Sequence, residues 1–166
     1  MSNETQENPG DQDQPQFALQ KIYLKDLSFE SPDPLEAFGK RLENPEINLQ
    51  LNNEIRNLED DRYEVVLDIT VTAKDKTSEK VIYLVEIKQA GLFGLRNFPE
   101  QELAAMLNGY CPGILFPYAR ETLSSIVERG GYPQLLLAPI NFEALYQQHL
   151  EKVSQAAAEQ ADQPKH

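Results

Sequence analysis

Few residues of this chain have the types and spacing that catalysis or metal binding requires. Cys111 is the only cysteine and His149 and His166 are the only histidines, so no disulfide can form within the chain and we expect no zinc site. Pro112 follows the cysteine in an apolar stretch, and apolar surroundings raise the pKa of a thiol and make it a poor nucleophile. We therefore predict that Cys111 is a buried structural thiol.

The other candidate groups have simpler explanations. His149 falls on the apolar side of a predicted helix, where a histidine is more often packed than catalytic. The segment GLFGLRNFPE (91–100) has two glycines but lacks the spacing and the Lys-Ser/Thr pair of a phosphate-binding loop. Three acidic pairs also have structural explanations. Asp11/Asp13 fall in a disordered segment, Asp60/Asp61 in a turn, and Glu100/Glu102 at the start of a helix. We expect no catalytic residue, no metal and no cofactor, and hence no enzyme.

Composition narrows the classes of partner. The 166 residues fit one domain, and 15 basic against 27 acidic residues give a formal charge of -12. Such a charge repels nucleic acid and anionic membranes, so we expect basic or apolar partners. The sequence contains neither a signal-peptide pattern nor an apolar run long enough to span a membrane. It predicts a cytoplasmic protein with no direct membrane insertion.

The chain divides into three parts. Residues 1–16 are acidic and almost without large apolar side chains, which predicts a disordered N-terminal arm. Residues 17–153 carry the apolar periodicity of a folded domain. Residues 154–166 are rich in Ala and Gln and predict a flexible C-terminal tail.

The first half of the domain has the alternation of β-strands. Strands are predicted at 20–30, 47–55, 63–73 and 81–91. The charged linkers 57–61 and 74–80 are short, which indicates hairpins and antiparallel pairing. A four-strand meander is the simplest arrangement of these strands.

The second half changes to a helical period. Helices are predicted at 99–109, 117–131 and 141–153. Pro99, Pro117 and Asn141 are typical of their first residues. The first helix is predicted to end at Gly109, and the second at Gly130 and Gly131. Strands followed by helices favour an α+β fold with helices on one side of the sheet. The apolar surface is large for one small core, so it is either packed internally or covered by self-association or an apolar ligand.

Five motifs together resemble a known family. They are IYLKDLSFESP (22–32), DDRYEVVLDITVTA (60–73), QAGLF (89–93), YCPGILFPYARE (110–121) and RGGYPQLLLAPINFEALY (129–146). In this order and spacing they strongly resemble the SecB family of protein-export chaperones, over about residues 17–150. The resemblance implies a four-stranded antiparallel sheet followed by helices, assembled as a homotetramer, a dimer of dimers with helices between sheets.

The resemblance also implies a function. SecB-like proteins are holdases that bind unfolded secretory precursor proteins, keep them competent for translocation and deliver them to the motor ATPase SecA, without a nucleotide of their own. A different role on the same fold is a chaperone dedicated to one client, such as a toxin-antitoxin partner.

Three sets of residues carry these implied roles. For the client-binding groove they are Phe38, Tyr83, Val85, Phe142 and Tyr146. For SecA binding they are Asp26, Glu30, Leu84 and Glu86. For the oligomer interface they are Ala119, Leu123, Ile126 and Val127. The chain contains no tryptophan, whereas relatives often carry one in the loop after the first strand, here 35–46.

Overall fold

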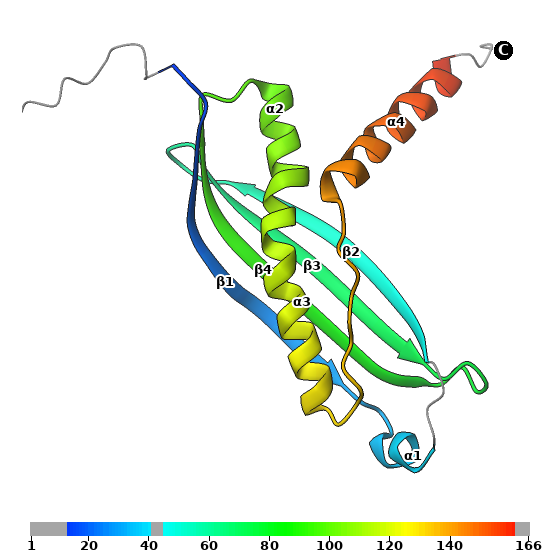
Figure 1. The fold of residues 1–166 in the computed structure, drawn as a ribbon. Helices are drawn as coiled ribbons and strands as arrows, with labels where there is room; N and C mark the ends of the chain where they lie inside the picture. Colours follow the sequence, from blue (N-terminus) through cyan, green and yellow to red (C-terminus); the bar gives the residue numbers. More distant parts are fainter. Residues whose placement is uncertain (1–12, 41–44, 162–166) are drawn as a thin grey trace, which may run out of the picture.

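The centre of the molecule is a four-stranded antiparallel sheet, seen in a computed structural model that describes residues 13–40 and 45–161 (Figure 1). Its strands are β1 (Gln16–Glu30), β2 (Glu46–Asn57), β3 (Arg62–Lys74) and β4 (Val81–Arg96). Each predicted strand is present and extends beyond its predicted bounds at one end or at both. In β3 the alternation places Val65, Ile69 and Val71 on one face, where they are fully buried, because α-helix covers that face.

The strand order corrects the predicted meander. The order is β1-β4-β3-β2, so β1 pairs with β4 and not with β2. The two short linkers produce the β2–β3 and β3–β4 hairpins as predicted. β4 is apolar on much of both faces, and a place between β1 and β3 buries most of it. The connection from β1 to β2 holds a short helix, α1 (Pro34–Gly39), and is long enough to reach a strand on the far side of the sheet.

The two helices predicted around Gly109 form one continuous helical run. It consists of α2 (Glu100–Ala105), a π-helical turn η1 (Met106–Tyr110) and α3 (Cys111–Arg129). Gly109 does not cap a helix, because the helical run continues through it, and a Cβ there would lie 3.1 Å from the Glu143 Cα. The absence of a side chain at Gly109 allows close packing against the next helix. Pro117, predicted as a helix start, lies inside α3 on its exposed side, where water can satisfy the carbonyl that a proline leaves unpaired.

α3 lies across one face of the sheet and closes the core (Figure 1). Leu115 and Leu123 are fully buried there. Gly91 of β4 allows the approach, since a Cβ at this position would come within 2.9 Å of the Leu115 Cδ2. Cys111 is buried at the start of α3, as predicted, and burial raises the pKa of its thiol to about 12.

Gly130 and Gly131 end α3, as predicted. The φ of Gly131 is 86°, a value that favours glycine. An extended segment, 133–141, then leads to α4 (Phe142–Ala161), which points away from the sheet (Figure 1). Asn141 caps it as predicted, its Oδ1 accepting a hydrogen bond from the Ala144 N–H at 3.0 Å. α4 continues past residue 154, the predicted start of the tail. The predicted arm lies almost wholly outside the described residues, as do the last residues of the tail.

Candidate functional site

Four aromatic side chains gather where α3 ends and α1 begins. We call Phe29, Phe38, Tyr83 and Tyr132 the aromatic cluster. Tyr132 is its centre, with ring centroids 5.1 Å from Tyr83, 5.3 Å from Phe38 and 6.4 Å from Phe29. Its hydroxyl also hydrogen-bonds with the Ser31 Oγ and approaches the Ile82 carbonyl oxygen at 3.5 Å. The cluster therefore joins β1, β4, α1 and the end of α3.

Phe38 is the exposed member of this cluster. Its side chain keeps 52% exposure, whereas Tyr83 and Tyr132 each keep 5%. Gly131 lies directly beneath its ring, since a Cβ at Gly131 would be 2.9 Å from the Phe38 Cζ. An aromatic ring that is seated on one face and open on the other can contact an apolar chain from outside.

The other predicted groove residues are placed differently. Val85 is fully buried in the core between sheet and α3, so it has no surface to offer in this conformation. Phe142 is nearly buried and packs near Phe116, with centroids 5.5 Å apart. Tyr146 of α4 is half-buried. The structure thus brings Phe38 and Tyr83 together at one end of the molecule and Phe142 and Tyr146 at the start of α4.

A chain of hollows follows the segment between these two places. Residues 134–137 and α3 line a hollow of about 510 Å³, residues 139–143 and the start of α3 line one of about 520 Å³, and Glu143, Tyr146 and Gln147 line a third of about 270 Å³. We call this surface the apolar track, after the apolar side chains that segment 135–142 contributes to it, although Arg120, Glu121 and Glu128 also line its first hollow. The volumes of its three hollows leave room for apolar side chains of an extended peptide.

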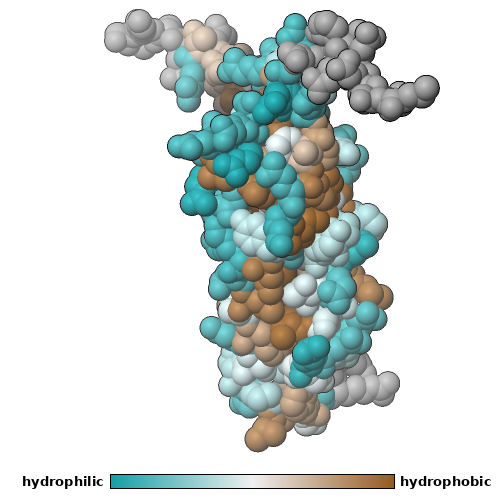
Figure 2. Space-filling view, turned by 90° about the vertical axis from the view of Figure 1, so that its left-hand side faces the viewer, coloured by the Kyte–Doolittle hydropathy of each residue, from teal (hydrophilic) through white to brown (hydrophobic). Residues whose placement is uncertain are grey.

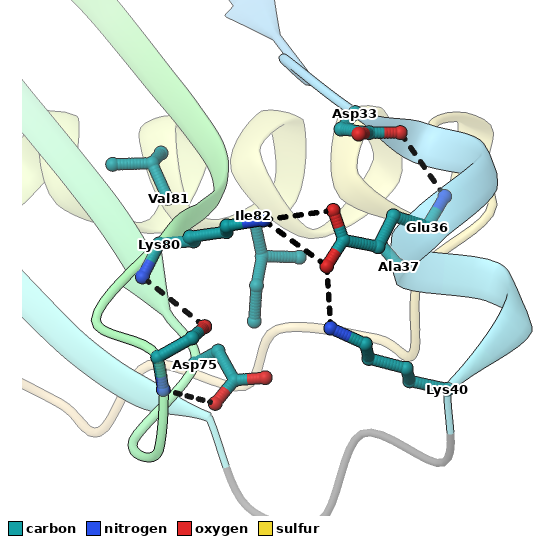
Figure 3. A pocket seen from close by; sticks show the side chains of 9 residues that line it. Asp33, Glu36, Ala37, Lys40, Asp75, Lys80, Val81 and Ile82 are labelled. Atoms are coloured by element: carbon teal, nitrogen blue, oxygen red, sulfur yellow. Dashed lines mark hydrogen bonds and ion pairs between the residues drawn. The ribbon is translucent and has the colours of Figure 1, made fainter.

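A smaller pocket lies under α1, lined by α1 and by the hairpin between β3 and β4 (Figure 3). Its volume is about 30 Å³, room for little more than one water molecule. Glu36 points across it and forms ion pairs with Lys40 and, at 3.0 Å, with Lys80. Hydrogen bonds first from Lys40 and then from Lys80 lower the pKa of Glu36 to about 2.

The opposite face of the sheet carries the residues predicted for SecA binding. In the β1–β4 register, Asp26 lies opposite Lys88, Ser28 opposite Glu86 and Glu30 opposite Leu84. Directly paired residues share a face, so Asp26, Glu30, Leu84 and Glu86 all lie on the face away from α3. We call these four residues the acidic patch. Within the residues that the structure describes, no cation forms an ion pair with its three carboxylates.

Nearby cations on this face are neutralised by other acids. Glu64 is 5% exposed, accepts a hydrogen bond from the Tyr23 hydroxyl and pairs with Lys25 at 3.0 Å and Arg56 at 3.3 Å. The hydrogen bond from the Tyr23 hydroxyl is the main reason that the pKa of Glu64 is lowered. The pKa of Tyr23 is raised to about 12, mainly by burial and secondly by its hydrogen bond to Glu64. Lys88 pairs with Glu54 and Asp68. The acidic patch therefore keeps its negative charge.

The side of the molecule at the β1 edge is apolar. Figure 2 shows brown surface running along this side between hydrophilic margins. Phe17, Leu19 and Leu24 of β1 are among its exposed apolar side chains, and the Phe17 ring lies 5.4 Å from that of Tyr110. Of the residues predicted for the oligomer interface, Ala119, Leu123 and Val127 are fully buried against their own sheet, and only Ile126 is partly exposed. Their place at an interface stays a prediction.

The family resemblance implies a groove along the segment that leads into the last helix, but the predicted site residues include neither Tyr132 nor any residue of 134–140. The signal for Tyr132 was an aromatic residue directly after the two glycines that end α3. For Leu135 the signal was its place in the apolar segment between Pro133 and Pro139, where the structure buries it, leaves Leu137 half-buried and exposes Leu136. Neither signal indicates which residues the side chain packs against, since those of Tyr132 lie on the distant elements β1, α1 and β4.

Comparison with known proteins identifies relatives across almost the whole chain. The family model of the preprotein translocase subunit SecB matches residues 10–153. A protein-export protein SecB of Marinobacter nauticus is 51% identical over 90% of this chain and 89% of its own. One of Methylococcus capsulatus is 47% identical over 95% of this chain and 96% of its own.

A solved structure shares the fold at lower identity. It is a SecB-like chaperone of Mycobacterium tuberculosis in complex with a peptide from an antitoxin, 18% identical, with a TM-score of 0.62, covering 75% of this chain and 90% of that one. Among residues 13–40 and 45–161, no helix has the length and apolar character to cross a membrane. The same residues hold no cluster of three His, Cys, Asp or Glu side chains that could bind a metal ion.

Proposed function

Because this chain belongs to the SecB family and is a chaperone of preprotein export, we propose that it holds unfolded secretory precursors on the apolar track and the aromatic cluster and delivers them to the motor ATPase SecA. Its family is one of chaperones and not of enzymes. We place this activity in the cytoplasm, where precursors are made. The observation that carries the proposal is that the exposed Phe38 ring rests on Gly131 and Tyr132, directly before the segment that lines the apolar track.

A holdase needs weak, repeated contacts that tolerate many sequences. The hollows of the track offer shallow apolar surface, and Phe38 offers an aromatic ring at one end of it. Folded proteins bury the apolar side chains that such a surface binds. Discrimination between unfolded and folded precursors follows from this difference without any chemical step.

We expect calorimetric titration to show binding of a precursor when it is unfolded and no binding when it is folded, with a negative heat-capacity change from apolar burial. Phe38→Ala and Tyr146→Ala should each weaken binding about fivefold, since each removes one aromatic contact among several. Tyr146→Phe keeps the ring and is the matched control, expected to bind as the unaltered chain does. Equal binding of the folded precursor would refute the holdase role.

The dedicated-client alternative has less support. The Mycobacterium tuberculosis chaperone that binds an antitoxin peptide shares the fold at 18% identity, while export proteins share about half of this sequence. The same titration separates the two roles, because failure with every unfolded precursor would favour a single dedicated client.

The assembly we propose is a homotetramer, a dimer of dimers with the helices between sheets. Apolar side chains at the β1 edge, together with the unpaired backbone of that edge strand, support association on this side (Figure 2). Light scattering after size exclusion at micromolar concentration should give four times the mass of the 18.9 kDa chain. A monomeric mass would contradict the assembly.

For delivery, the acidic patch lies on the sheet face away from the apolar track. A chaperone that binds its client on one face and the motor on the other can bind both at once. Uncompensated carboxylates favour a basic docking surface on the motor. Variants that test the acidic patch are described in the Discussion.

A further inference from the structure

Helix α1 is too short to hold its own position. It has six residues, with one side-chain cap in which the Asp33 Oδ1 accepts a hydrogen bond from the Glu36 N–H at 3.1 Å. Helices of this length are not stable in isolation, so tertiary contacts must fix α1. Its location decides where the Phe38 ring is presented.

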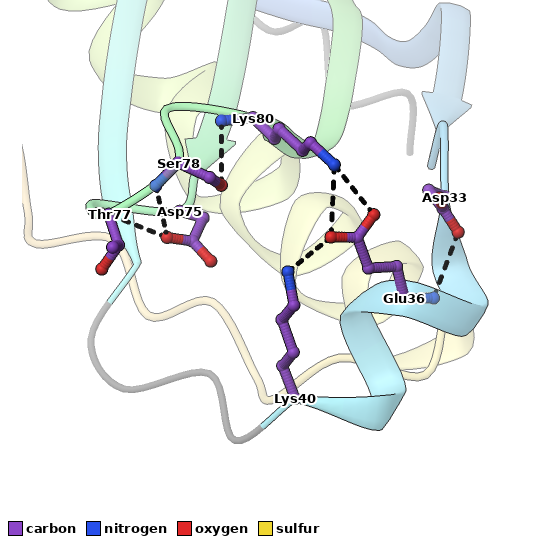
Figure 4. Close-up of polar contacts among 7 residues, drawn as sticks. All are labelled: Asp33, Glu36, Lys40, Asp75, Thr77, Ser78 and Lys80. Carbon is purple, nitrogen blue, oxygen red and sulfur yellow. Dashed lines mark hydrogen bonds and ion pairs between the residues drawn. The ribbon is translucent and has the colours of Figure 1, made fainter.

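Contacts of two kinds tie α1 to the rest of the molecule. Apolar contacts come from Ala37, which is buried, and from Phe38, which rests on Tyr132 and Gly131. A polar contact comes from Glu36, whose carboxylate oxygens accept hydrogen bonds from the Lys80 Nζ at 3.0 and 3.2 Å (Figure 4). Phe38 lies two residues from Glu36 in the same helix, so the ion pair and the ring move together.

Lys80 starts from a well-fixed turn. The Asp75 Oδ1 accepts hydrogen bonds from the Thr77 and Ser78 N–H groups at 2.7 and 3.1 Å (Figure 4). The Asp75 N–H also donates to the Lys80 carbonyl oxygen at 2.9 Å. The hairpin end is thus a rigid anchor for the lysine. Lys40, the second cation on Glu36, lies four residues after it at the end of α1, so its ion pair stays within one segment, and toward the hairpin it has only a weaker charge attraction to Asp75.

We infer that Glu36 and Lys80 are positioning residues for client binding, which together fasten α1 to the β3–β4 hairpin and hold the Phe38 ring over Tyr132. This inference rests on the proposed function, in which Phe38 contacts unfolded precursors. Without the ion pair, α1 is held to the hairpin side by apolar contacts alone, and Phe38 samples more orientations than the one in which it rests on Tyr132. The Lys80 side chain is largely exposed and that of Glu36 partly so, hence salt screens the ion pair and the fixation weakens as ionic strength rises.

The chain offers a direct probe of this position. It contains no tryptophan, so Phe38→Trp introduces a single indole whose fluorescence anisotropy reports the mobility of this side chain. Into this background we would place Lys80→Gln and Lys40→Gln. Each removes one cation from the same carboxylate, but only the first removes the ion pair between α1 and the hairpin. Lys80→Arg keeps the charge and serves as the conservative rescue.

We expect Lys80→Gln to lower the anisotropy of the introduced indole and to abolish its dependence on salt, while Lys40→Gln and Lys80→Arg retain both. In the chain with Phe38 intact, Lys80→Gln should weaken binding of an unfolded precursor about threefold at low salt, the size typical of exposed ion pairs. Lys40→Gln should leave that affinity unchanged.

Equal effects of Lys40→Gln and Lys80→Gln would overturn the inference, because the carboxylate would then serve only the stability of α1. A drop in anisotropy without loss of client affinity would also overturn it. Phe38→Ala distinguishes this failure from that of the proposed function. If Phe38→Ala binds precursors as the unaltered chain does, the client surface is misassigned, whereas weakened binding by Phe38→Ala leaves only the positioning role refuted.

Discussion

A chain carrying Asp26→Lys and Glu30→Lys is expected to lose affinity for SecA by about tenfold or more at low ionic strength and to keep its affinity for unfolded precursors. Both carboxylates lie on the sheet face away from the apolar track, and neither forms an ion pair among the described residues. Reversal would put two cations against a basic docking surface, and like charges at an interface slow association and weaken binding. It should also reverse the salt dependence of the association rate, since screening acts on exposed charges.

Surface plasmon resonance with immobilised SecA, at low and high salt, measures this effect. The matched control is Glu59→Lys with Glu151→Lys, which changes the net charge equally at exposed positions outside the acidic patch. If the control loses as much SecA binding as the patch variant, net charge and not the acidic patch drives docking. If the patch variant loses client binding to the same degree, the carboxylates serve the fold.

Replacing Tyr132 by alanine should lower the free energy of unfolding by about 3–5 kcal/mol, the range for truncating a large buried aromatic residue. Tyr132 is 5% exposed and its ring contacts three others, so the alanine leaves a cavity that β1, α1 and β4 all border. Urea denaturation followed by circular dichroism, at one protein concentration for all variants, measures the loss.

Tyr132→Phe separates the ring from its hydroxyl. It keeps the ring contacts and removes the hydrogen bond with Ser31, so we expect a cost of about 1 kcal/mol. A loss below about 1 kcal/mol for Tyr132→Ala would mean that the aromatic cluster contributes little to stability and that other contacts hold α1 and α3 together.

Local patterns made much of the fold predictable. The alternation in β3 and the short linkers fix the β2–β3–β4 hairpins, because neighbouring strands joined by a few residues have almost no other way to pair. Asn141 and the pair Gly130 and Gly131 bound their helices as predicted, since caps depend on local hydrogen bonds and on φ.

The pairing partner of β1 was not predictable in this way. The register of β1 on β4 shifts between Leu19 and Lys21 and again between Leu24 and Asp26, and such irregularities interrupt the simple alternation of a strand. The choice of β4 as partner depends on burial of a strand about sixty residues away, and no local pattern states it.

Gly109 shows the same limit for helices. A glycine at the end of an apolar period is typical of a cap, and the sequence alone cannot distinguish this from a glycine that makes room for Glu143 of another helix. The members of the acidic patch share one surface in part because they lie two or four residues apart on single strands, although the β1–β4 pairing is what joins the two halves.

By itself the sequence determined the four strands, most of the helical residues outside α1, the buried thiol, the negative charge and, through its motifs, the family. Only the tertiary structure decided the strand order, the continuity of α2 with α3, the burial of Val85 and the central place of Tyr132. The physical reason is the distance along the sequence between the residues that interact. Caps, alternation and hairpins are settled by hydrogen bonds and burial within a few residues, whereas a side chain becomes core or surface according to what distant segments place over it.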